Sequence, residues 1–310
     1  MRETVSVIIP TRDRPRLIHR AVRSALAQSY ESIEVIVVVD GPDDATTKAL
    51  LHIRDSRLRI LTLPANVGPA AARNAGVNEA RGVWVAFLDD DDEWFPRKLE
   101  VQIEAASCSR CAFPIVASRF IHRKRGRESL RPTRLIAPSE PLSEYLFTRP
   151  TPFAEGRIHP TMLLVPKRLL HEVPFDSDLR VWEDLDWLLR VHTLKGVGIE
   201  FMPAPLGIVH EHGEFAVERV SRDWRRSFAW IQEIRHLVTP RAYAGFLLTL
   251  LAPLAARQAG WKAFWPLLKE ALRFGRPRAI DFLLYAEAWL VPDKVKQGLR
   301  DLHNRWRSSR

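Results

Sequence analysis

Two hydrophobic periods alternate along residues 5–88, and this alternation limits the possible folds more than any other feature of the chain. Apolar runs typical of buried strands lie at residues 5–10, 33–40, 58–63 and 83–88. Apolar residues at helical spacing follow Arg14, and a helix of small residues is expected at 68–80. Strands that alternate with helices assemble into a mostly parallel sheet with helices on its faces. We therefore expect an α/β fold.

Acidic residues follow two of the expected strands. Asp40 ends the second strand, and a run of acids at residues 89–93 directly follows the fourth. Ligands of open α/β sheets bind just beyond the carboxyl ends of the strands. These acids therefore lie where a binding site is expected.

The acids at residues 89–93 predict a divalent cation. Like charges a few ångströms apart repel one another, and a bound cation neutralises them. Oxygen ligands suit Mg²⁺ or Mn²⁺, and Mg²⁺ usually takes few protein carboxylates while phosphates and water complete its shell. The alternative is a solvated acidic turn at the start of the next helix, where acids are also favoured.

A second group of acids opens a helix expected at residues 179–192. Glu183 and Asp184 lie near its first turn, and the leucines that follow them would face the core. A carboxylate in this position can take the proton of an acceptor hydroxyl. Capping of the helix by an acid explains the same pattern without chemistry. The spacing alone leaves both interpretations open.

The middle of the chain, residues 113–150, shows no clear hydrophobic period. It combines an apolar strand candidate with the basic loop 123–127 and several prolines. We expect an irregular segment here that faces the substrate of the expected site. Further short strands are expected at residues 161–165 and within 199–209.

Positive charge is concentrated in the last 90 residues, which hold 17 Lys and Arg against 7 Asp and Glu, whereas residues 1–220 hold 30 of each. This division predicts a catalytic domain at residues 1–220 and a basic helical region at 221–310. Six of the ten tryptophans lie in that basic region. Two interpretations are open, because such helices suit an anionic membrane surface, whereas a helical cap would bury the tryptophans in its own core.

Several classes of protein are disfavoured. The longest apolar stretch, 242–256, is shorter than the roughly 20 residues that span a bilayer, and the run at 5–10 is too short for a secretory signal. Cys108 and Cys111 suit neither a disulfide framework nor, with His122, a complete zinc site. The basic region carries no nucleic-acid-binding signature. We expect a cytoplasmic protein without a nucleic-acid partner.

Five motifs in order resemble those of glycosyltransferase family 2, over roughly residues 4–213. They are the first strand and its loop at 5–15, Val-Val-Val-Asp-Gly-Pro-Asp-Asp at 37–44, Asn-Val-Gly-Pro-Ala-Ala-Ala-Arg-Asn-Ala-Gly at 66–76, Trp-Val-Ala-Phe-Leu-Asp-Asp-Asp-Asp-Glu at 84–93, and the acidic stretch 174–190. Pro42 and Pro174 depart from the usual serine and glycine. The resemblance implies a GT-A type, Rossmann-like sheet that is mostly parallel and flanked by helices.

The resemblance also implies roles for single residues. Asp40 would contact the nucleobase of the donor. The other residues of the nucleotide pocket would be Pro10, Thr11, Asp13, Arg73, Asp89 and Asp90. Asp91 is implied as the metal ligand that links the cation to the diphosphate. Asp184 is implied as the general base, with Glu183 in support on the acceptor side.

The segment Val-His-Glu-His-Gly at residues 209–213 resembles the family's Arg-x-His segment. His212 aligns with the histidine near the diphosphate and is implied as a second metal ligand. His210 replaces the usual arginine and is expected to support the acceptor side. Because either ring nitrogen can bind a metal or donate a hydrogen bond, the choice between the two histidines is open.

Together the residues and the resemblance predict an inverting glycosyltransferase. A sugar would pass from a nucleotide-diphosphate donor, most readily a UDP-sugar, to a glycan or lipid-linked acceptor, with Mn²⁺ or Mg²⁺ as cofactor. The setting would be cell-surface polysaccharide or glycolipid synthesis at the inner face of the cytoplasmic membrane. The alternative is a non-catalytic member that binds nucleotide sugar or glycan. The fold does not specify the donor sugar, the base or the acceptor.

Overall fold

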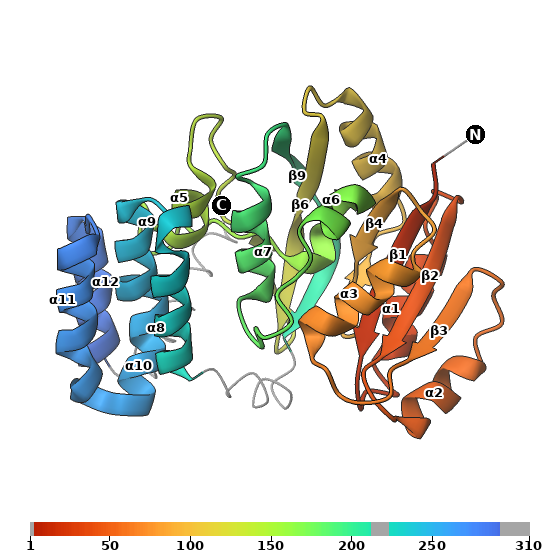
Figure 1. Ribbon diagram of the computed structural model, residues 1–310, viewed down its shortest axis with the longest axis horizontal. Coiled ribbons are helices and arrows are strands. Elements are labelled where there is room, and N and C mark those ends of the chain that lie inside the picture. The colour runs from red at the N-terminus through yellow and green to blue at the C-terminus, as the bar shows by residue number, and fades with distance from the viewer. Residues whose placement is uncertain (1–2, 212–222, 292–310) are drawn as a thin grey trace. The chain divides into compact units, whose positions relative to one another are not determined.

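The computed structural model describes residues 3–211 and 223–291, and the chain divides into two compact units. The first unit combines Met1–Ala137 with Arg157–Val220, and the second combines Pro138–Gly156 with Ser221–Arg310. Figure 1 shows the sheet and its helices in the first unit and a group of helices in the second. The predicted boundary at residue 220 lies outside the described residues and stays a prediction. No sequence signal predicted that residues 138–156 group with the C-terminal helices.

One sheet runs through the described part of the first unit, in the order β3-β2-β1-β4-β8-β6-β9-β5, with β7 paired to β6 (Figure 1). Its strands are β1 Val5–Thr11, β2 Ile33–Val39, β3 Leu58–Thr62, β4 Trp84–Phe87, β5 Glu93–Trp94, β6 Phe113–Lys124, β7 Arg127–Arg131, β8 Leu164–Pro166 and β9 Val197–Glu211. β1 pairs with β2 and β4, and β2 with β3, all in parallel. The predicted parallel sheet is confirmed for these four strands. Their carboxyl ends therefore share one edge.

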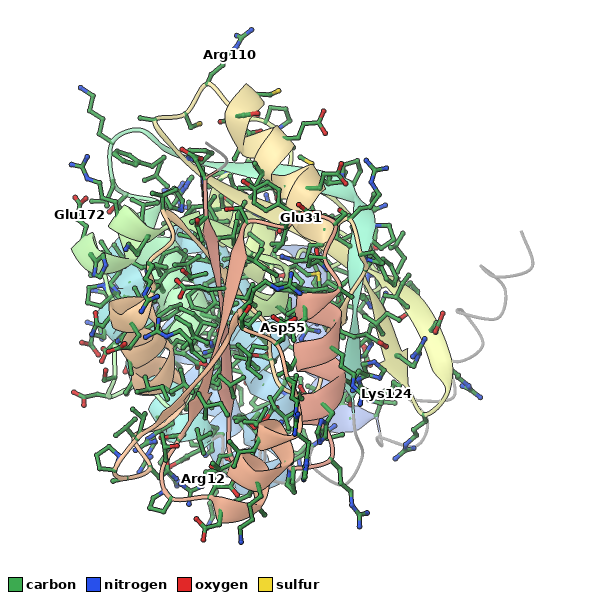
Figure 2. All side chains as sticks on the ribbon, turned by 90° about the vertical axis from the view of Figure 1, so that its right-hand side faces the viewer. Arg12, Glu31, Asp55, Arg110, Lys124 and Glu172 are labelled. Atoms are coloured by element: carbon green, nitrogen blue, oxygen red, sulfur yellow. The ribbon has the colours of Figure 1, made fainter. Side chains whose placement is uncertain are left out.

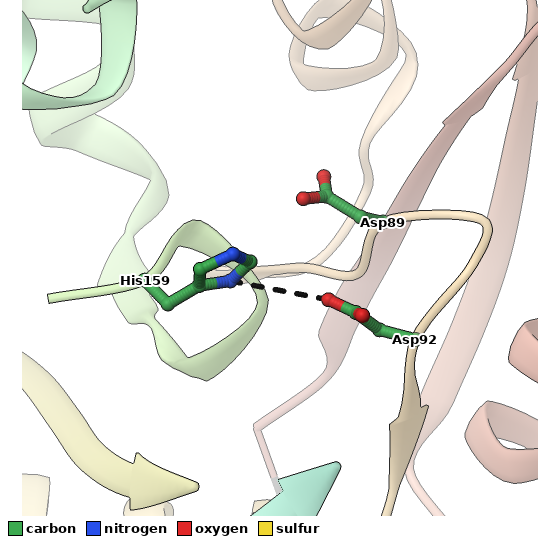
Figure 3. Close-up of side chains that lie close together, drawn as sticks. All are labelled: Asp89, Asp92 and His159. Atoms are coloured by element: carbon green, nitrogen blue, oxygen red, sulfur yellow. Dashed lines mark ion pairs between the residues drawn. The ribbon is translucent and has the colours of Figure 1, made fainter. Parts of the chain in front are cut away.

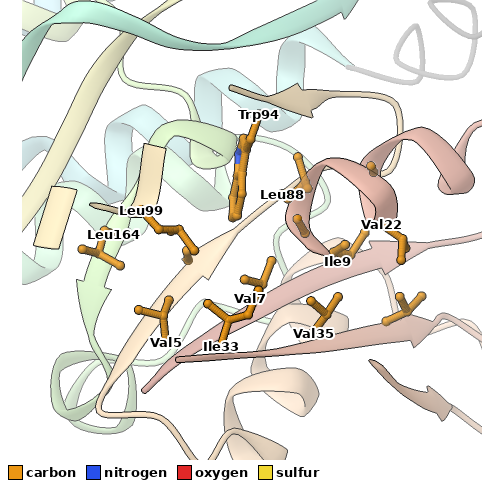
Figure 4. Packing of buried hydrophobic residues seen from close by; sticks show 14 of the residues in the cluster. Val5, Val7, Ile9, Val22, Ile33, Val35, Leu88, Trp94, Leu99 and Leu164 are labelled. Carbon is orange, nitrogen blue, oxygen red and sulfur yellow. The ribbon is translucent and has the colours of Figure 1, made fainter. Parts of the chain in front are cut away.

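Helices cover the sheet of the first unit. They are α1 Ile18–Leu26, α2 Asp44–Leu51, α3 Pro69–Glu79, α4 Lys98–Cys108, α6 Lys167–Glu172 and α7 Glu183–Val191. β2 is buried along its whole length, which is typical of a strand covered on both faces. In the core, Val7, Val22 and Val35 come from β1, α1 and β2 (Figure 4).

The expectation of an irregular segment at residues 113–150 is wrong. β6 takes up twelve of these residues and forms a hairpin with β7. Its first half is buried, whereas its second half carries mostly partly exposed polar residues and still pairs with β9. Backbone hydrogen bonds with β9 therefore extend β6 beyond the core. Its polar second half lacks the apolar pattern from which a strand is predicted.

Gly76 is expected to be intolerant of any side chain, because α3 approaches the sheet closely there. A Cβ atom at this position would lie 2.5 Å from Cγ2 of Ile8 and 3.1 Å from Cγ2 of Val38. Overpacking of a filled core costs about 1–3 kcal/mol. We therefore expect Gly76→Ala to lower the free energy of unfolding by this amount in urea denaturation. Asn78→Ala, on the exposed side of the same helix, is the matched control and is expected to cost nothing; equal stability of the two variants would contradict the prediction.

The second unit is helical in its described residues. It contains α5 Leu142–Phe147, α8 Trp224–Glu233, η3 Ile234–Leu237, α9 Pro240–Gly245, the π-helix η4 Phe246–Leu251, α10 Ala252–Ala259, η5 Gly260–Ala263, α11 Phe264–Phe274 and α12 Ala279–Leu290. Phe147 explains why the segment 138–156 belongs here, because its ring lies 5.1 Å from that of Phe246 and 6.3 Å from that of Trp230. None of the described helices is long and apolar enough to cross a bilayer.

The described tryptophans of the basic region differ in exposure, and Trp289 is half-buried. Trp224 and Trp230 are buried, as expected of a helical cap, whereas Trp261 and Trp265 are 60% and 62% exposed. Trp306 lies outside the described residues. The burial expected from the cap interpretation is therefore found on α8 but not on η5 or at the start of α11, and both interpretations stay predictions.

Candidate active site

The acids predicted from the sequence lie along the edge where the parallel strands end. Thr11 ends β1 opposite Val39 of β2, and residues 89–92 follow β4. Figure 2 shows Arg12, next to the end of β1, and Lys124, at the end of β6, toward one end of the sheet, away from Arg110. The sheet topology therefore brings the candidate residues to one edge, as the sequence predicts.

Asp90 and Asp91 are buried in the loop that follows β4. Asp90 accepts hydrogen bonds from the hydroxyl of Thr11 at 2.7 Å and from the guanidinium of Arg14 at 2.7 Å. Arg14 also lies 3.3 Å from the Asp91 carboxylate, and Arg20 donates to the backbone carbonyl of Asp91. Burial raises the pKa of Asp90 to about 6, although Arg14 opposes the shift. Arginines therefore offset part of the repulsion that the sequence assigned to a cation alone.

Asp92 is held by a different set of partners. Its carboxylate accepts hydrogen bonds from the hydroxyl of Thr161 at 2.7 Å and from the backbone N–H of His210 at 3.0 Å. Nδ1 of His159 lies 3.9 Å from the same carboxylate (Figure 3). Burial and the neighbouring carboxylates of Asp89 and Asp91 raise the pKa of Asp92 well above its usual value. The site therefore carries a carboxyl group that favours a proton or a cation.

The residues of this loop fit a divalent cation. Ligand atoms of Asp89, Asp92 and His159 all lie within 4.8 Å of one another (Figure 3). Oδ1 of Asp91 is buried and has no hydrogen-bond partner among the described residues. Carboxylate oxygens with one imidazole form a donor set that Mn²⁺ accepts and that Mg²⁺ accepts in part. The predicted ligand Asp91 and the triad are thus both suited to a cation, whereas the other predicted ligand, His212, lies outside the described residues.

Residues 89–92, which follow β4, are called the acid loop. Arg73 joins the acid loop to the second group of acids, Glu183 and Asp184. This arginine of α3 is only 4% exposed, and it donates to Glu183 at 2.8 Å and to Asp89 at 3.0 Å. Asp184 follows Glu183 in the first turn of α7 and is partly buried. Burial and the adjacent Glu183 carboxylate raise the pKa of Asp184 to about 6, while Arg73 opposes the shift. The two predicted groups of acids therefore belong to one site.

Four of the predicted nucleotide-pocket residues lie at or just beyond the ends of β1 and β2, namely Pro10, Thr11, Asp13 and Asp40. Asp40 is buried, and its carboxylate accepts hydrogen bonds from the backbone N–H groups of Val67 at 2.7 Å and Gly68 at 2.9 Å, which fixes the loop before α3. Asp13 has an exposed side chain 3.2 Å from Arg12. Pro10 lies within β1. Asp40 therefore has a structural task, and a nucleobase contact for it stays a prediction.

His210 is buried near the end of β9, and its Nε2 lies 2.8 Å from the carboxylate of Glu93. Burial lowers the pKa of His210, although Glu93 opposes the shift. Its backbone N–H donates to the carboxylate of Asp92. A role for the His210 ring on the acceptor side stays a prediction.

Reasoning from the sequence missed His159 and Thr161. The hydroxyl of Thr161 makes two hydrogen bonds with the acid loop. It donates to the carboxylate of Asp92 and accepts from the backbone N–H of Asp89. Both residues directly precede β8, which pairs antiparallel with β4. An antiparallel neighbour begins where β4 ends, so recognition of that pairing would have predicted their position.

Known proteins resemble this chain along most of its length. The family profile described as "Glycosyl transferase family 2" matches residues 6–173 of this chain. The succinoglycan biosynthesis protein ExoO of Rhizobium meliloti is 31% identical over 227 residues, which are 70% of this chain and 63% of ExoO. WfgD of Escherichia coli, a UDP-Glc:alpha-D-GlcNAc-diphosphoundecaprenol beta-1,3-glucosyltransferase, is 39% identical over 32% of this chain and 39% of its own length. The chain thus covers less than two thirds of each of these two relatives.

Among solved structures, that of S. aureus TarS 1-349 in complex with UDP has a TM-score of 0.53 at 19% identity, over 95% of this chain and 92% of that one. A likeness at this identity concerns the fold, and it confirms the predicted GT-A type α/β sheet with C-terminal helices. The family profile covers more than half of the chain and includes the acid loop and Arg73. This chain therefore belongs to glycosyl transferase family 2.

Proposed function

We propose that this chain is an inverting, metal-dependent glycosyltransferase that moves a sugar from a nucleotide-diphosphate donor to a hydroxyl acceptor. The observation that supports the proposal is the bridge from Arg73 to Asp89 and Glu183, because Asp184 directly follows Glu183 in the first turn of α7. A direct displacement needs a group that activates the acceptor next to groups that hold the donor. One site with both sets of acids meets this need.

Asp184 is the proposed general base. With a pKa of about 6, its carboxylate is ionised at neutral pH yet more basic than an ordinary aspartate. A base works best when its pKa lies near the working pH. The carboxylate takes the proton of the acceptor hydroxyl while that oxygen attacks the anomeric carbon from the face opposite the diphosphate. The bond to the diphosphate breaks in the same step, and the configuration inverts.

The acid loop is the proposed donor site. Asp91, with Asp89, Asp92 and His159, would hold a divalent cation, which stabilises the charge that develops on the departing diphosphate. Arg14 and Arg20 hold the loop in place through Asp90 and Asp91. The remaining residues proposed to line the nucleotide pocket are Pro10, Thr11, Asp13, Asp40 and Arg73.

A UDP-sugar is the proposed donor, and a lipid-linked or polymeric glycan is the proposed acceptor. Structures named TarS contain UDP and UDP-GlcNAc, which supports a uridine donor. The names of ExoO and of TuaG, a putative teichuronic acid biosynthesis glycosyltransferase of Bacillus subtilis, support a role in polysaccharide synthesis. The name of WfgD includes a diphosphoundecaprenol acceptor, which supports action at the inner face of the cytoplasmic membrane.

Thermal unfolding of the full chain with nucleotides tests the proposed donor site. A ligand at about 100 times its Kd stabilises the folded state by about 2.7 kcal/mol. We expect UDP to raise the Tm in the presence of Mn²⁺ and much less in the presence of EDTA. Asp91→Asn is expected to remove the metal-dependent part of this shift, whereas the exposed control Asp178→Asn keeps it.

Two outcomes of this experiment would count against the proposal. If no nucleotide diphosphate raises the Tm with either Mn²⁺ or Mg²⁺, the proposed donor site is wrong. If UDP-sugars bind but no acceptor glycan receives sugar from any of them, the chain is instead a nucleotide-sugar-binding member of the family.

A further inference from the structure

The second unit exposes an unusual number of large apolar side chains on η5, α11 and α12. Six such residues are at least 40% exposed, namely Trp261, Trp265, Leu272, Phe282, Leu283 and Leu290. Soluble monomers rarely expose extended apolar patches, and such patches usually mark a contact surface. We call these six residues the apolar face.

Helical spacing and aromatic contacts connect the residues of the apolar face. Trp265 and Leu272 are seven residues apart on α11, as are Leu283 and Leu290 on α12, so each pair lies on one side of its helix. The Trp261 ring lies 5.8 Å from that of Trp289 on α12. Phe264, next to Trp265, packs its ring 5.0 Å from that of Tyr285 on α12. The start of α11 and the end of α12 are therefore one packed element.

Positive charges accompany the apolar face. The exposed charged residues of 260–290 are Lys262, Lys269, Arg273, Arg276 and Arg278, and all of them are basic. The acids in this range are less exposed: Asp281 is buried at the start of α12, whereas Glu287 and Glu270 are half-buried, and Glu270 accepts hydrogen bonds from Tyr243 and Gln232. Lys269 and Arg273 lie on the same exposed side of α11 as Trp265.

We propose that the apolar face binds the surface of an anionic lipid bilayer. Helices that combine tryptophan and leucine with Lys and Arg lie in the interface between headgroups and acyl chains, where the rings reach the acyl boundary and the cations meet anionic headgroups. Each basic residue near such a surface contributes about 1 kcal/mol. A second copy of this chain fits less well, because an isologous contact would place the same five cations opposite one another. A nucleic acid would leave the leucines without an apolar partner.

This inference deepens the membrane location in the proposed function, and its test requires neither donor nor acceptor. The full chain is mixed with phosphatidylcholine vesicles, with or without phosphatidylglycerol, and the bound fraction is measured by sedimentation. We expect binding to the anionic vesicles, weaker binding as salt is raised, and little binding to neutral vesicles. Failure of this test leaves nucleotide binding and transfer untouched, so the two proposals fail separately.

Variants identify the surface that binds. Lys269→Ala with Arg273→Ala is expected to weaken binding to anionic vesicles about 30-fold, because two contacts with the anionic surface are lost. Trp265→Ser with Leu283→Ser is expected to remove most of the binding that persists at high salt. Leu51→Ser is the matched control, since Leu51 is 67% exposed on α2 of the other unit, and it is expected to bind as the natural sequence does.

Three results would overturn the proposal. One is the absence of binding to anionic vesicles, and another is equal binding by the control and both double variants. The third is a stable dimer that the Leu283→Ser change dissociates and that shows no affinity for vesicles, which would assign the apolar face to a second copy of the chain.

Discussion

Asp184→Asn is expected to lower the rate of sugar transfer by about 10²- to 10⁴-fold, the usual contribution of a general base. The asparagine keeps the shape of the side chain but cannot take the acceptor's proton. Donor affinity is expected to change little, because the acid loop and its arginines are unaltered. Steady-state kinetics with the UDP-sugar and acceptor would therefore show a loss in kcat with a nearly constant donor KM.

The pH profile gives an independent check on Asp184. Because burial raises its pKa to about 6, transfer by the natural sequence is expected to fall as the pH drops through about 6, where the base becomes protonated. This limb should be missing from the residual activity of Asp184→Asn. A variant that retains full kcat would show that another group is the base, whereas a limb that persists at low activity would be assigned to Asp90, whose pKa is also raised to about 6.

The stability of the Asp184→Asn variant is expected to move in the opposite direction from its activity. The pKa is higher in the fold than in the unfolded chain, so ionisation of Asp184 costs stability that accumulates as the pH rises from the usual value of 3.8 to about 6. Removal of the charge relieves the repulsion from Glu183. Urea denaturation at neutral pH is therefore expected to show equal or higher stability, which excludes unfolding as the cause of the lost activity.

Arg73→Gln is expected to lower the free energy of unfolding by about 3 kcal/mol, because it removes a buried cation that bridges Asp89 and Glu183. Two carboxylates would then remain close together with little solvent. Protonation of a carboxylate removes its charge, so the loss of stability should shrink at acidic pH. Urea denaturation at neutral and acidic pH measures both effects.

Two comparisons separate this effect from the general loss of an arginine. Arg59→Gln is the control, since its bridges to Glu34 and Glu79 are partly exposed, and such pairs contribute about 1 kcal/mol or less. Arg73→Gln combined with Glu183→Gln is expected to recover part of the stability, because one of the unpaired charges is gone. If Arg73→Gln lowered the free energy of unfolding by no more than Arg59→Gln does, the bridge from Arg73 to Asp89 and Glu183 would contribute no more to stability than an exposed ion pair.

The sequence by itself determined the parallel half of the sheet and the place of its acids. The strands β1, β2 and β4 are buried on both faces, so each of them reads as a short continuous apolar run. Such a run can be recognised from the local sequence alone. Parallel strands end at one edge, so Asp40 and the acids after β4 could be assigned to a common site before any contact was known. The helix α7 was also predicted from its acids and leucines, although it begins at Glu183 and not at the expected residue 179.

Tertiary structure alone decided which partners these acids have. Arg73 and Glu183 are separated by 110 residues, and Thr161 and Asp92 by 69, so no local pattern predicts either contact. The polar half of β6 and the grouping of residues 138–156 with the C-terminal helices were hidden for the same reason. Exposure of Trp261 and burial of Trp230 likewise depend on packing between helices and not on helical period. The spacing of apolar residues shows which side of a helix or strand tends to be buried. The contact partners and the exposure of a side chain depend on which elements pack together.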